Sequence, residues 1–423
     1  MKGILKHIKW SFISTISTQL MVFASITILA NILEATDFGR FVILQTILAN
    51  LMLLSTAGLS ITCARYIPFI KNDKKKLSLI VSYCLATVGF FALIIVLLAY
   101  FFSSLLSELY FDDNGYSYGF IIISIAGFFV SVDGLLKNVL IGFGSTKIYA
   151  KSCVFGVVLY LPITILMTFK FDLPGAVIAL LLNSVIQFFV TFWYSNKQLR
   201  TSGFAWDFKG FIYFKEVAIK FAFPALVSGL MVLPVHSMVQ FILINYGEGV
   251  VQVAMLGIAM QWFNIFQLMP VIINRVLLPN FSESYAAGKA IDVANGVNKA
   301  MCYTLLVFSS LMIFSCMFLY SFGGYLYGDF PGVVKIIFLF LLASIIKGVL
   351  SPVGSMILSK GNVWLSVFVN LIWLITYLVL SFILVGLGAL GIGVSILIAY
   401  STQSAILFFI NYKNIRKRGA IRC

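Results

Sequence analysis

Long apolar runs recur along the whole chain, and short polar connections separate them. About 20 consecutive apolar residues cross the hydrocarbon core of a bilayer as a helix. The runs lack the period-two alternation of β-barrel strands, so the pattern predicts a bundle of membrane-spanning helices. Twelve spans are expected, at 8–33, 39–63, 78–102, 119–144, 148–170, 174–195, 217–245, 251–278, 301–322, 332–359, 362–385 and 388–411.

The spans indicate an internal duplication. "QLMV" at 19–22 matches "GLMV" at 229–232 with a shift of 210, and Arg65 matches Arg275 at the same shift. "PGAVIALLLNSV" from 174 matches "LGIGVSILIAYS" from 390 with a shift of 216, which requires a six-residue insertion in the second half. Because six spans is an even number, the two repeats have the same orientation, related by an axis along the membrane normal.

The predicted fold is therefore an all-α integral membrane protein with twelve transmembrane helices in two six-helix lobes. The lobes are 1–195 and 217–423, and the longest polar and basic connection, 196–216, is the expected cytoplasmic linker. Two such lobes around a central cavity are typical of an alternating-access transporter.

Composition and charge support this prediction and orient it. The chain has 423 residues, of which 61% are hydrophobic and 10% charged, and its net charge is +15. With a cytoplasmic N-terminus, 24 of the 29 basic residues fall in cytoplasmic tails, loops or span ends, as the positive-inside rule requires. Both termini are then cytoplasmic, and the charge needs no nucleic-acid partner. The basic start "MKGILKHIKWSF" resembles a signal peptide, but its apolar run is too long, so we expect a retained first span.

Motifs for an enzyme or a bound cofactor are absent from the sequence. The chain has neither a Walker, an HExxH nor a GxSxG sequence, and no large loop that a membrane glycosyltransferase or polymerase would use. The six cysteines lack metal-ligand spacing, and the chain has two histidines. We expect no cofactor, no metal and no disulfide.

Two lysines, Lys137 and Lys347, lie inside predicted spans. A lysine at the bilayer centre costs at least ~2.5–3.5 kcal/mol, so it usually marks a site or has a partner. Lys137 can reach the headgroups along its stem, or pair with Asp133 four residues earlier, or line a cavity. Lys347 lies near the middle of its span, which favours a cavity. The two lysines correspond at a shift of 210 but not at 216, so their equivalence stays open.

Other polar residues lie inside the spans. The first span carries Ser11, Thr15 (or Ser14), Thr18 and Ser25 on one helical face, either as helix-packing contacts or as a cavity wall. The eighth span carries Gln261, Asn264 and Gln267 at helical spacing.

The seventh span contains Pro224 and Pro234, which predict kinks or a break. His236, two residues after the second proline, is either a packed hydrogen-bonding residue or a proton-coupling group. Asp133 is a second candidate for coupling. Embedded cations with a single embedded carboxylate favour an anionic substrate, with phosphate as the natural candidate.

The segment "LEATDFGRFVILQTILANLMLLSTAGLSITCARYIP" from 33 resembles the opening repeat of polysaccharide-biosynthesis flippases. These proteins belong to the multidrug/oligosaccharidyl-lipid/polysaccharide (MOP) exporter superfamily. "FGRF", "AGLS" and the Arg65-Tyr66 pair carry the resemblance, and "LLPNFSE" from 277 is similar to the second-half counterpart.

The resemblance implies a Wzx-type flippase in the bacterial cytoplasmic membrane. Such a protein moves polyprenyl-diphosphate-linked oligosaccharides to the outer leaflet for O-antigen, capsule or exopolysaccharide, driven by an ion gradient. Lys137 and Lys347 would then contact the diphosphate, with Arg40 and Arg275 at the two mouths of the cavity. Membrane lipids are implied partners, as are a polysaccharide polymerase and a chain-length regulator. An ion-coupled multidrug exporter of the same superfamily is the alternative, although its usual carboxylate in span one or seven is missing.

Overall fold

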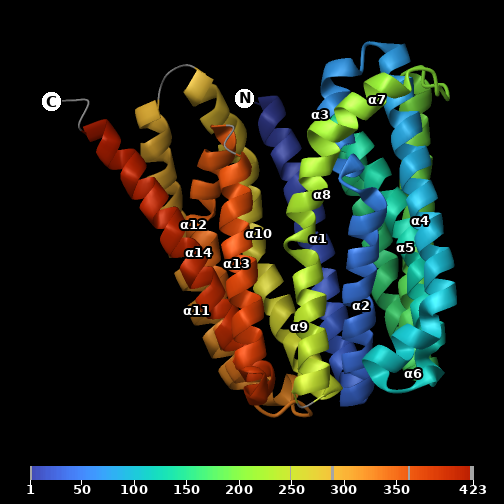
Figure 1. Ribbon diagram of the computed structural model, residues 1–423, viewed down its shortest axis with the longest axis vertical. Helices are drawn as coiled ribbons and strands as arrows, with labels where there is room; N and C mark the ends of the chain where they lie inside the picture. Colours follow the sequence, from blue (N-terminus) through green and yellow to red (C-terminus); the bar gives the residue numbers. More distant parts are fainter. Residues whose placement is uncertain (1, 248, 287–289, 361–362, 420–423) are drawn as a thin grey trace. The chain divides into compact units, whose positions relative to one another are not determined.

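The computed structural model describes residues 2–247, 249–286, 290–360 and 363–419. The described residues form helices and turns without strands, as the sequence predicts. By contacts the chain divides into two compact units, 1–237 and 238–423. Figure 1 shows each unit as a bundle of long helices.

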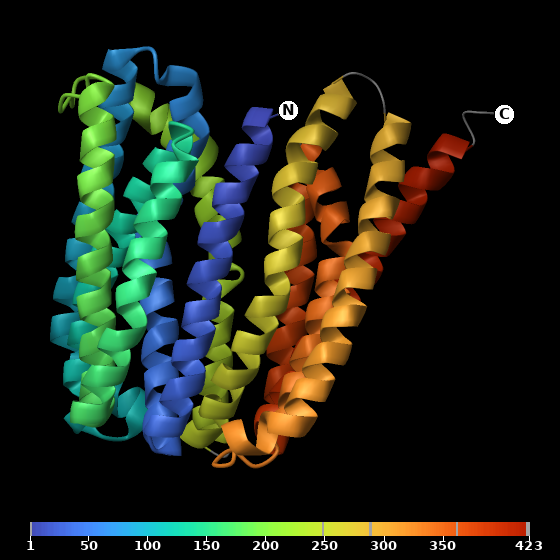
Figure 2. The ribbon, with the colours of Figure 1, turned by 180° about the vertical axis from the view of Figure 1, so that it is seen from behind.

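Unit 1 contains the first six spans and the start of the seventh. Its helices are α1 (Lys2–Ile32), α2 (Ala35–Thr56), α3 (Leu59–Ile70), α4 (Lys74–Phe111), α5 (Ser117–Gly142), α6 (Thr146–Thr201), α7 (Phe211–Val217), α8 (Phe223–Leu230) and the first residues of α9 (Leu233–Tyr246). A short 3-10 helix, Asn114–Tyr116, precedes α5, and a π-helical turn, Ala218–Ala222, joins α7 to α8. Figure 2 shows α1 beside the long α6, with which it packs.

Unit 2 contains the remaining spans. Its helices are the rest of α9, then α10 (Val250–Ala286), α11 (Ala290–Leu326), α12 (Val333–Ser359), α13 (Val363–Ile383) and α14 (Gly388–Gly419), with a 3-10 turn, Val385–Leu387, before the last. α12 packs between α10 and α14, and α13 packs on α14.

The predicted spans are present, but four of them are not separate, unbroken helices. Among the described residues, ten helices are long and apolar enough to cross a membrane. One of them, α6, contains two predicted spans that meet at Asp172, where the backbone leaves the helical region. The seventh span is divided among α7, α8 and α9, and the expected single helix 39–63 is broken between α2 and α3.

The breaks have local causes. Ala57 and Gly58 both have left-handed backbone angles, with φ of 43° and 75°, which ends α2 and restarts the chain as α3. Pro234 is the second residue of α9, where the missing N–H of proline costs no helical hydrogen bond. Pro224 comes just after the π-helical turn, and the helix continues through it into α8. The expected break is confirmed before Pro234, where the turn at 231–232 separates α8 from α9, whereas the chain at Pro224 stays helical.

The connection 196–216 packs against unit 1. α6 continues through Thr201, and the following segment runs along α4, where the Ser78 and Ser82 hydroxyls accept hydrogen bonds from the N–H groups of Ala205 and Asp207, both at 3.1 Å. α7 then folds onto α4, with the ring of Phe214 stacked on Tyr83. The division by contacts therefore falls within α9 and not in the predicted linker. The two predicted six-helix lobes stay a prediction.

The fifth and sixth spans of each half are joined by the same tight turn. Asp172 has φ 48° and ψ −133°, and Gly388, its counterpart at the shift of 216, has φ 61° and ψ −145°. Three residues further on, Gly175 and Gly391 each approach a carbonyl so closely that a Cβ would lie 2.0 Å from its oxygen. This shared geometry supports the predicted duplication at that shift.

Candidate functional site

Lys347 lies in the middle of α12, inside unit 2. Twelve residues separate it from the end of the helix at Ser359, or about 18 Å along the axis. A lysine side chain cannot span that distance to reach the headgroups. The ammonium is therefore held within the helix bundle, as its central position in the sequence predicted.

Aromatic side chains from two neighbouring helices surround this ammonium. Lys347 Nζ donates a hydrogen bond of 3.2 Å to the hydroxyl of Tyr400 on α14. It also lies 4.9 Å from the Tyr400 ring centroid and 5.1 Å from that of Phe263 on α10. The rings of Phe263 and Tyr400 are stacked, with centroids 5.6 Å apart. A cation over two aromatic faces gains about 2 kcal/mol or more when desolvated, which offsets much of the insertion cost.

More aromatic residues support the two rings. Trp373 on α13 lies against Tyr400, with ring centroids 5.3 Å apart, and Tyr377 lies against Trp373. Both are almost fully buried, as are Phe263 and Tyr400. We call Lys347, Phe263, Tyr400, Trp373 and Tyr377 the aromatic lysine site. Packing on all sides fixes the position of the rings and therefore that of the charge.

No carboxylate pairs with Lys347 in the described part of the chain. The Tyr400 hydroxyl accepts one of the three N–H bonds of the ammonium. Two donors and a positive charge are left for an anionic ligand. Phosphate oxygens suit such a site, because hydrogen bonds between ionised groups are about twice as strong as neutral ones.

Gln267 and Ser344 fix the helix next to this site. The Gln267 amide on α10 donates hydrogen bonds to the backbone carbonyl and the hydroxyl of Ser344, at 2.9 and 2.8 Å. Ser344 lies one turn before Lys347 on α12. One polar residue of the eighth span therefore joins α10 to α12 and positions Lys347.

The cation of unit 1, Lys137, is neutralised by its own helix. Its Nζ lies 2.7 Å from Oδ2 of Asp133, which confirms the ion pair that the i, i+4 spacing suggested. Asp133 is 5% exposed, and its second oxygen, Oδ1, is buried without a hydrogen-bond partner. Lys137 is five residues from the end of α5, close enough for a long stem to reach the membrane surface.

The helix bounds decide the repeat register that the sequence left open. α5 begins at Ser117 and α12 at Val333, and they end at Gly142 and Ser359, which gives shifts of 216 and 217. These shifts differ from 210 by six or seven, which exceeds the one or two residues by which helix ends are uncertain. Lys137 and Lys347 are therefore not equivalent, and Lys347 corresponds to Ser131.

The pairing of Arg65 with Arg275 changes in the same way. α2 begins at Ala35 and α10 at Val250, and α4 ends at Phe111 and α11 at Leu326, which gives a shift of 215 in both cases. A pairing of the two arginines at a shift of 210 does not fit these bounds. The insertion therefore precedes the second span of the second half.

Arg40 is engaged at the start of α2. Its guanidinium lies 2.7 Å from Oδ1 of Asp37, and it is stacked over the ring of Tyr116 at 4.1 Å. These contacts hold the first turns of α2 against the 3-10 helix that precedes α5. Nε of Arg40 is buried without an acceptor.

The remaining predicted residues are His236, Arg275 and the polar residues of the first span. His236 is half-buried on α9, next to Ser237, whose hydroxyl accepts a hydrogen bond of 2.5 Å from the Asn50 amide. The side chain of Arg275 lies outside the described residues. On α1, Ser14 and Ser25 are buried, and the Thr18 hydroxyl donates to the Ser14 carbonyl.

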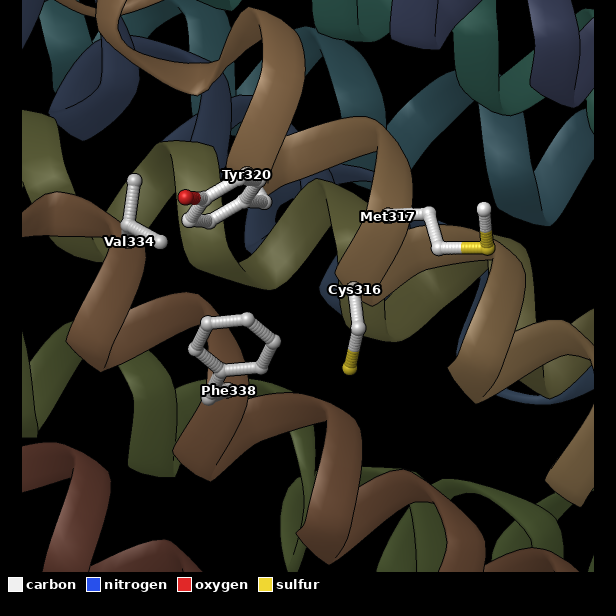
Figure 3. A pocket seen from close by; sticks show the side chains of 5 residues that line it. All are labelled: Cys316, Met317, Tyr320, Val334 and Phe338. Carbon is white, nitrogen blue, oxygen red and sulfur yellow. The ribbon is translucent and has the colours of Figure 1, made fainter.

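An apolar pocket of about 450 Å³ lies between α11 and α12 (Figure 3). Its lining is Cys316, Met317, Tyr320, Val334 and Phe338. Tyr320 is 94% exposed, so the pocket opens to the outer face of the bundle. It offers no charged group to an anion and is separate from the aromatic lysine site.

The sequence singled out Lys347 but missed its aromatic partners. Phe263, Trp373, Tyr377 and Tyr400 come from three spans and carry no distinctive spacing in a chain that is 16% aromatic. At a shift of 216, Tyr400 corresponds to Ser184 and Trp373 to Val157. The available signal was this difference between the repeats: the second repeat has aromatic residues where the first has small or aliphatic ones. It could have pointed to the partners of Lys347.

Solved structures of transporters of the MOP superfamily share this fold. An inward-facing multidrug resistance MATE family transporter of that superfamily matches with a TM-score of 0.79 and 14% identity over 95% of each chain. An outward-facing one matches with 0.72 and 17% over 98% of this chain and 96% of that one. A mutant of the Vibrio cholerae MATE transporter VcmN matches with 0.71 and 15% over 98% and 97%.

The family is shown by the sequence itself. The model of the polysaccharide biosynthesis protein family matches residues 4–285, two thirds of the chain. The protein belongs to this family. No curated protein matches the chain.

Proposed function

We propose that this protein is a flippase for polyprenyl-diphosphate-linked oligosaccharides. It moves repeat units from the inner to the outer leaflet of the bacterial cytoplasmic membrane, with both of its termini in the cytoplasm. The glycan then serves O-antigen, capsule or exopolysaccharide synthesis, together with a polymerase and a chain-length regulator. Family membership and the transporter fold support a membrane exporter, and the charge of the aromatic lysine site supports the diphosphate.

The observation that carries the proposal is the uncompensated cation Lys347. Its ammonium is positioned by Tyr400 and Phe263 and keeps two donors for a ligand. A half-buried charge in mid-membrane is costly, and a ligand would offset the part of the cost that the aromatic rings leave. A diphosphate supplies negative charge and several acceptor oxygens at once.

The mechanism follows from alternating access. The diphosphate enters from the inner leaflet, Lys347 offsets its charge, and the prenyl tail stays in lipid while the polar glycan crosses inside the protein. An ion gradient drives the return, with Asp133 and His236 as the candidate groups for coupling. Reopening outward lets water and ions compete for the diphosphate and releases it.

A multidrug exporter is the second candidate, because the solved structures that share the fold include multidrug resistance transporters. A cationic drug would need an anionic or neutral site. The carboxylate of Asp133 is already paired with Lys137. The charge balance therefore favours an anionic cargo.

The test measures surface glycan and lipid-linked intermediates in a strain that lacks this protein. The strain is complemented with wild type, Lys347→Ala, Lys347→Arg or the matched control Lys335→Ala. Lys335 lies in the first turn of the same helix and is exposed. We expect wild type and Lys335→Ala to restore surface glycan, Lys347→Arg to restore part of it, and Lys347→Ala to restore less than a tenth at equal membrane levels.

Completed lipid-linked units should accumulate inside the cells that carry Lys347→Ala. Full activity of Lys347→Ala would show that Lys347 does not bind the diphosphate. It would not change the family to which the protein belongs. Normal surface glycan in the deletion strain, together with increased drug sensitivity, would overturn the flippase and favour the exporter.

A further inference from the structure

A pocket of about 360 Å³ opens on unit 1 between the start and the end of α6. It is lined by Lys147, Ile148 and Lys151 from the first turns and by Tyr194, Lys197, Gln198 and Thr201 from the last. The two halves of α6 form a hairpin at Asp172, which brings these distant segments together. Both halves of α6 can be followed in Figure 2.

Three lysines surround the pocket and are exposed. The lining contains no acidic side chain, and no ion pair in the described part of the chain involves Lys147, Lys151 or Lys197. Three like charges at one pocket repel each other and gain energy from a common anion. The start of α6 adds the partial positive charge of a helix N-terminus on the same side.

Hydrogen-bonding groups add to the charge. The Ser145 hydroxyl donates a hydrogen bond of 3.0 Å to Oε1 of Gln198. The contact fixes the amide and leaves its Nε2 donors for a ligand. Amide donors and ammonium groups together suit the oxygens of a phosphate group.

The surroundings place the pocket at the membrane surface. It lies at the end of membrane-spanning segments, next to the turn at 143–145 and the connection after Thr201. Trp193 is 68% exposed beside Tyr194, and Lys147 lies over the ring of Trp10 on α1, with Nζ 5.8 Å from the centroid. Tryptophan and tyrosine at span ends are typical of the headgroup layer.

We propose that this pocket binds the phosphate headgroup of an anionic phospholipid. Basic pockets between transmembrane helices at this depth take such headgroups, and acyl chains can follow the apolar faces of the two halves of α6. A soluble anion would gain the charge but not the apolar contacts of the lysine stems and the rings. The inference concerns a bilayer lipid and does not depend on the transported cargo.

The experiment uses the full-length protein in neutral detergent, titrated with cardiolipin, phosphatidylglycerol, phosphatidylethanolamine or inorganic pyrophosphate. Binding is followed by native mass spectrometry and by acetylation of individual lysines. We expect cardiolipin and phosphatidylglycerol to bind and to protect Lys147, Lys151 and Lys197 from acetylation. Phosphatidylethanolamine and pyrophosphate should not.

The variant Lys147→Gln, Lys151→Gln, Lys197→Gln should bind cardiolipin about 100-fold more weakly, because each lysine near an anionic headgroup contributes a factor of about five. Its control removes the same charge from exposed lysines of unit 1 outside the pocket: Lys71→Gln, Lys75→Gln, Lys209→Gln. The control should change affinity less than threefold.

Three results would overturn the proposal. Equal losses in both triple variants would mean that net charge alone attracts the lipid. Pyrophosphate that protects the three lysines as well as cardiolipin does would indicate a site for soluble anions. Unchanged cardiolipin binding in the pocket variant would place the lipid elsewhere. None of these results bears on Lys347 or on glycan export, so the two proposals fail separately.

Discussion

The two lysines within the spans illustrate two ways to keep a cation in a membrane. Lys137 is paired with Asp133 one turn away and is near the end of its helix. Lys347 is in mid-span and is held by one hydroxyl and two ring faces. An ion pair removes the net charge, whereas aromatic faces stabilise the cation without neutralising it. The second arrangement alone keeps a charge available for an anion.

The ion pair in unit 1 makes a prediction at this scale. Asp133→Asn or Lys137→Gln alone should lower the free energy of unfolding by about 2–3 kcal/mol, somewhat less than the ~3–5 kcal/mol of a fully buried pair, because Lys137 is 22% exposed. The double variant should recover at least half of that loss, because it leaves no unpaired charge. SDS-induced unfolding of the purified protein measures all three. Additive losses in the double variant would show that the two groups do not interact.

At the scale of elements, the two halves resemble each other most clearly in the hairpin that joins their fifth and sixth spans. Both turns need a residue with positive φ and strongly negative ψ, a region that side chains disfavour. The second half supplies Gly388, whereas the first half has Asp172. The first hairpin is therefore strained at one residue and the second is not.

Asp172→Gly should stabilise the protein by about 1 kcal/mol, because it removes that strain. The matched control is Asp112→Gly at the end of α4. Asp112 has φ 52° and ψ 24°, a left-handed conformation that aspartate tolerates, so the gain there should be smaller. Denaturation of both variants under the same conditions decides the comparison. An equal or larger gain at 112 would mean that the backbone at 172 carries no extra strain.

The whole molecule is a duplicated transporter whose register follows its helix bounds. The starts of α2 and α10, the ends of α4 and α11, and both ends of α5 and α12 agree on a shift close to 216. The difference from 210 is accommodated in the broken seventh span, where α7, the π-helical turn, α8 and α9 replace a single helix. The polar connection before it is packed on α4.

The orientation in the membrane can be tested on the whole protein. In a variant without native cysteines, Asp113→Cys and Asp329→Cys should react with a membrane-impermeant maleimide in intact spheroplasts. Ser202→Cys should react only after the membrane is opened. The expectation rests on the excess of basic residues on the side of Ser202. Labelling of Ser202→Cys from outside would reverse the orientation.

Much of the fold and part of the site could be predicted from the sequence. Run length and hydrophobicity are local quantities, so the spans and the class of fold follow from them. Proline is a local sign too, and it marked the break before Pro234. A lysine in mid-span is likewise visible as an exception to an apolar pattern. The predicted span 39–63 ran through the break at Ala57 and Gly58, although the glycine in the small-residue motif "AGLS" was a local sign of a left-handed backbone.

The sequence by itself determined the helical membrane architecture, the duplication and the presence of two embedded cations, because the bilayer imposes length and polarity on each segment separately. Only the tertiary structure decided that Lys137 is paired, that Lys347 faces Tyr400 and Phe263, and that the two are not equivalent. It also brought three lysines from opposite ends of α6 to one pocket. These outcomes depend on which helix faces meet, and helices in a membrane select partners by packing and hydrogen bonding, which hydrophobicity does not encode.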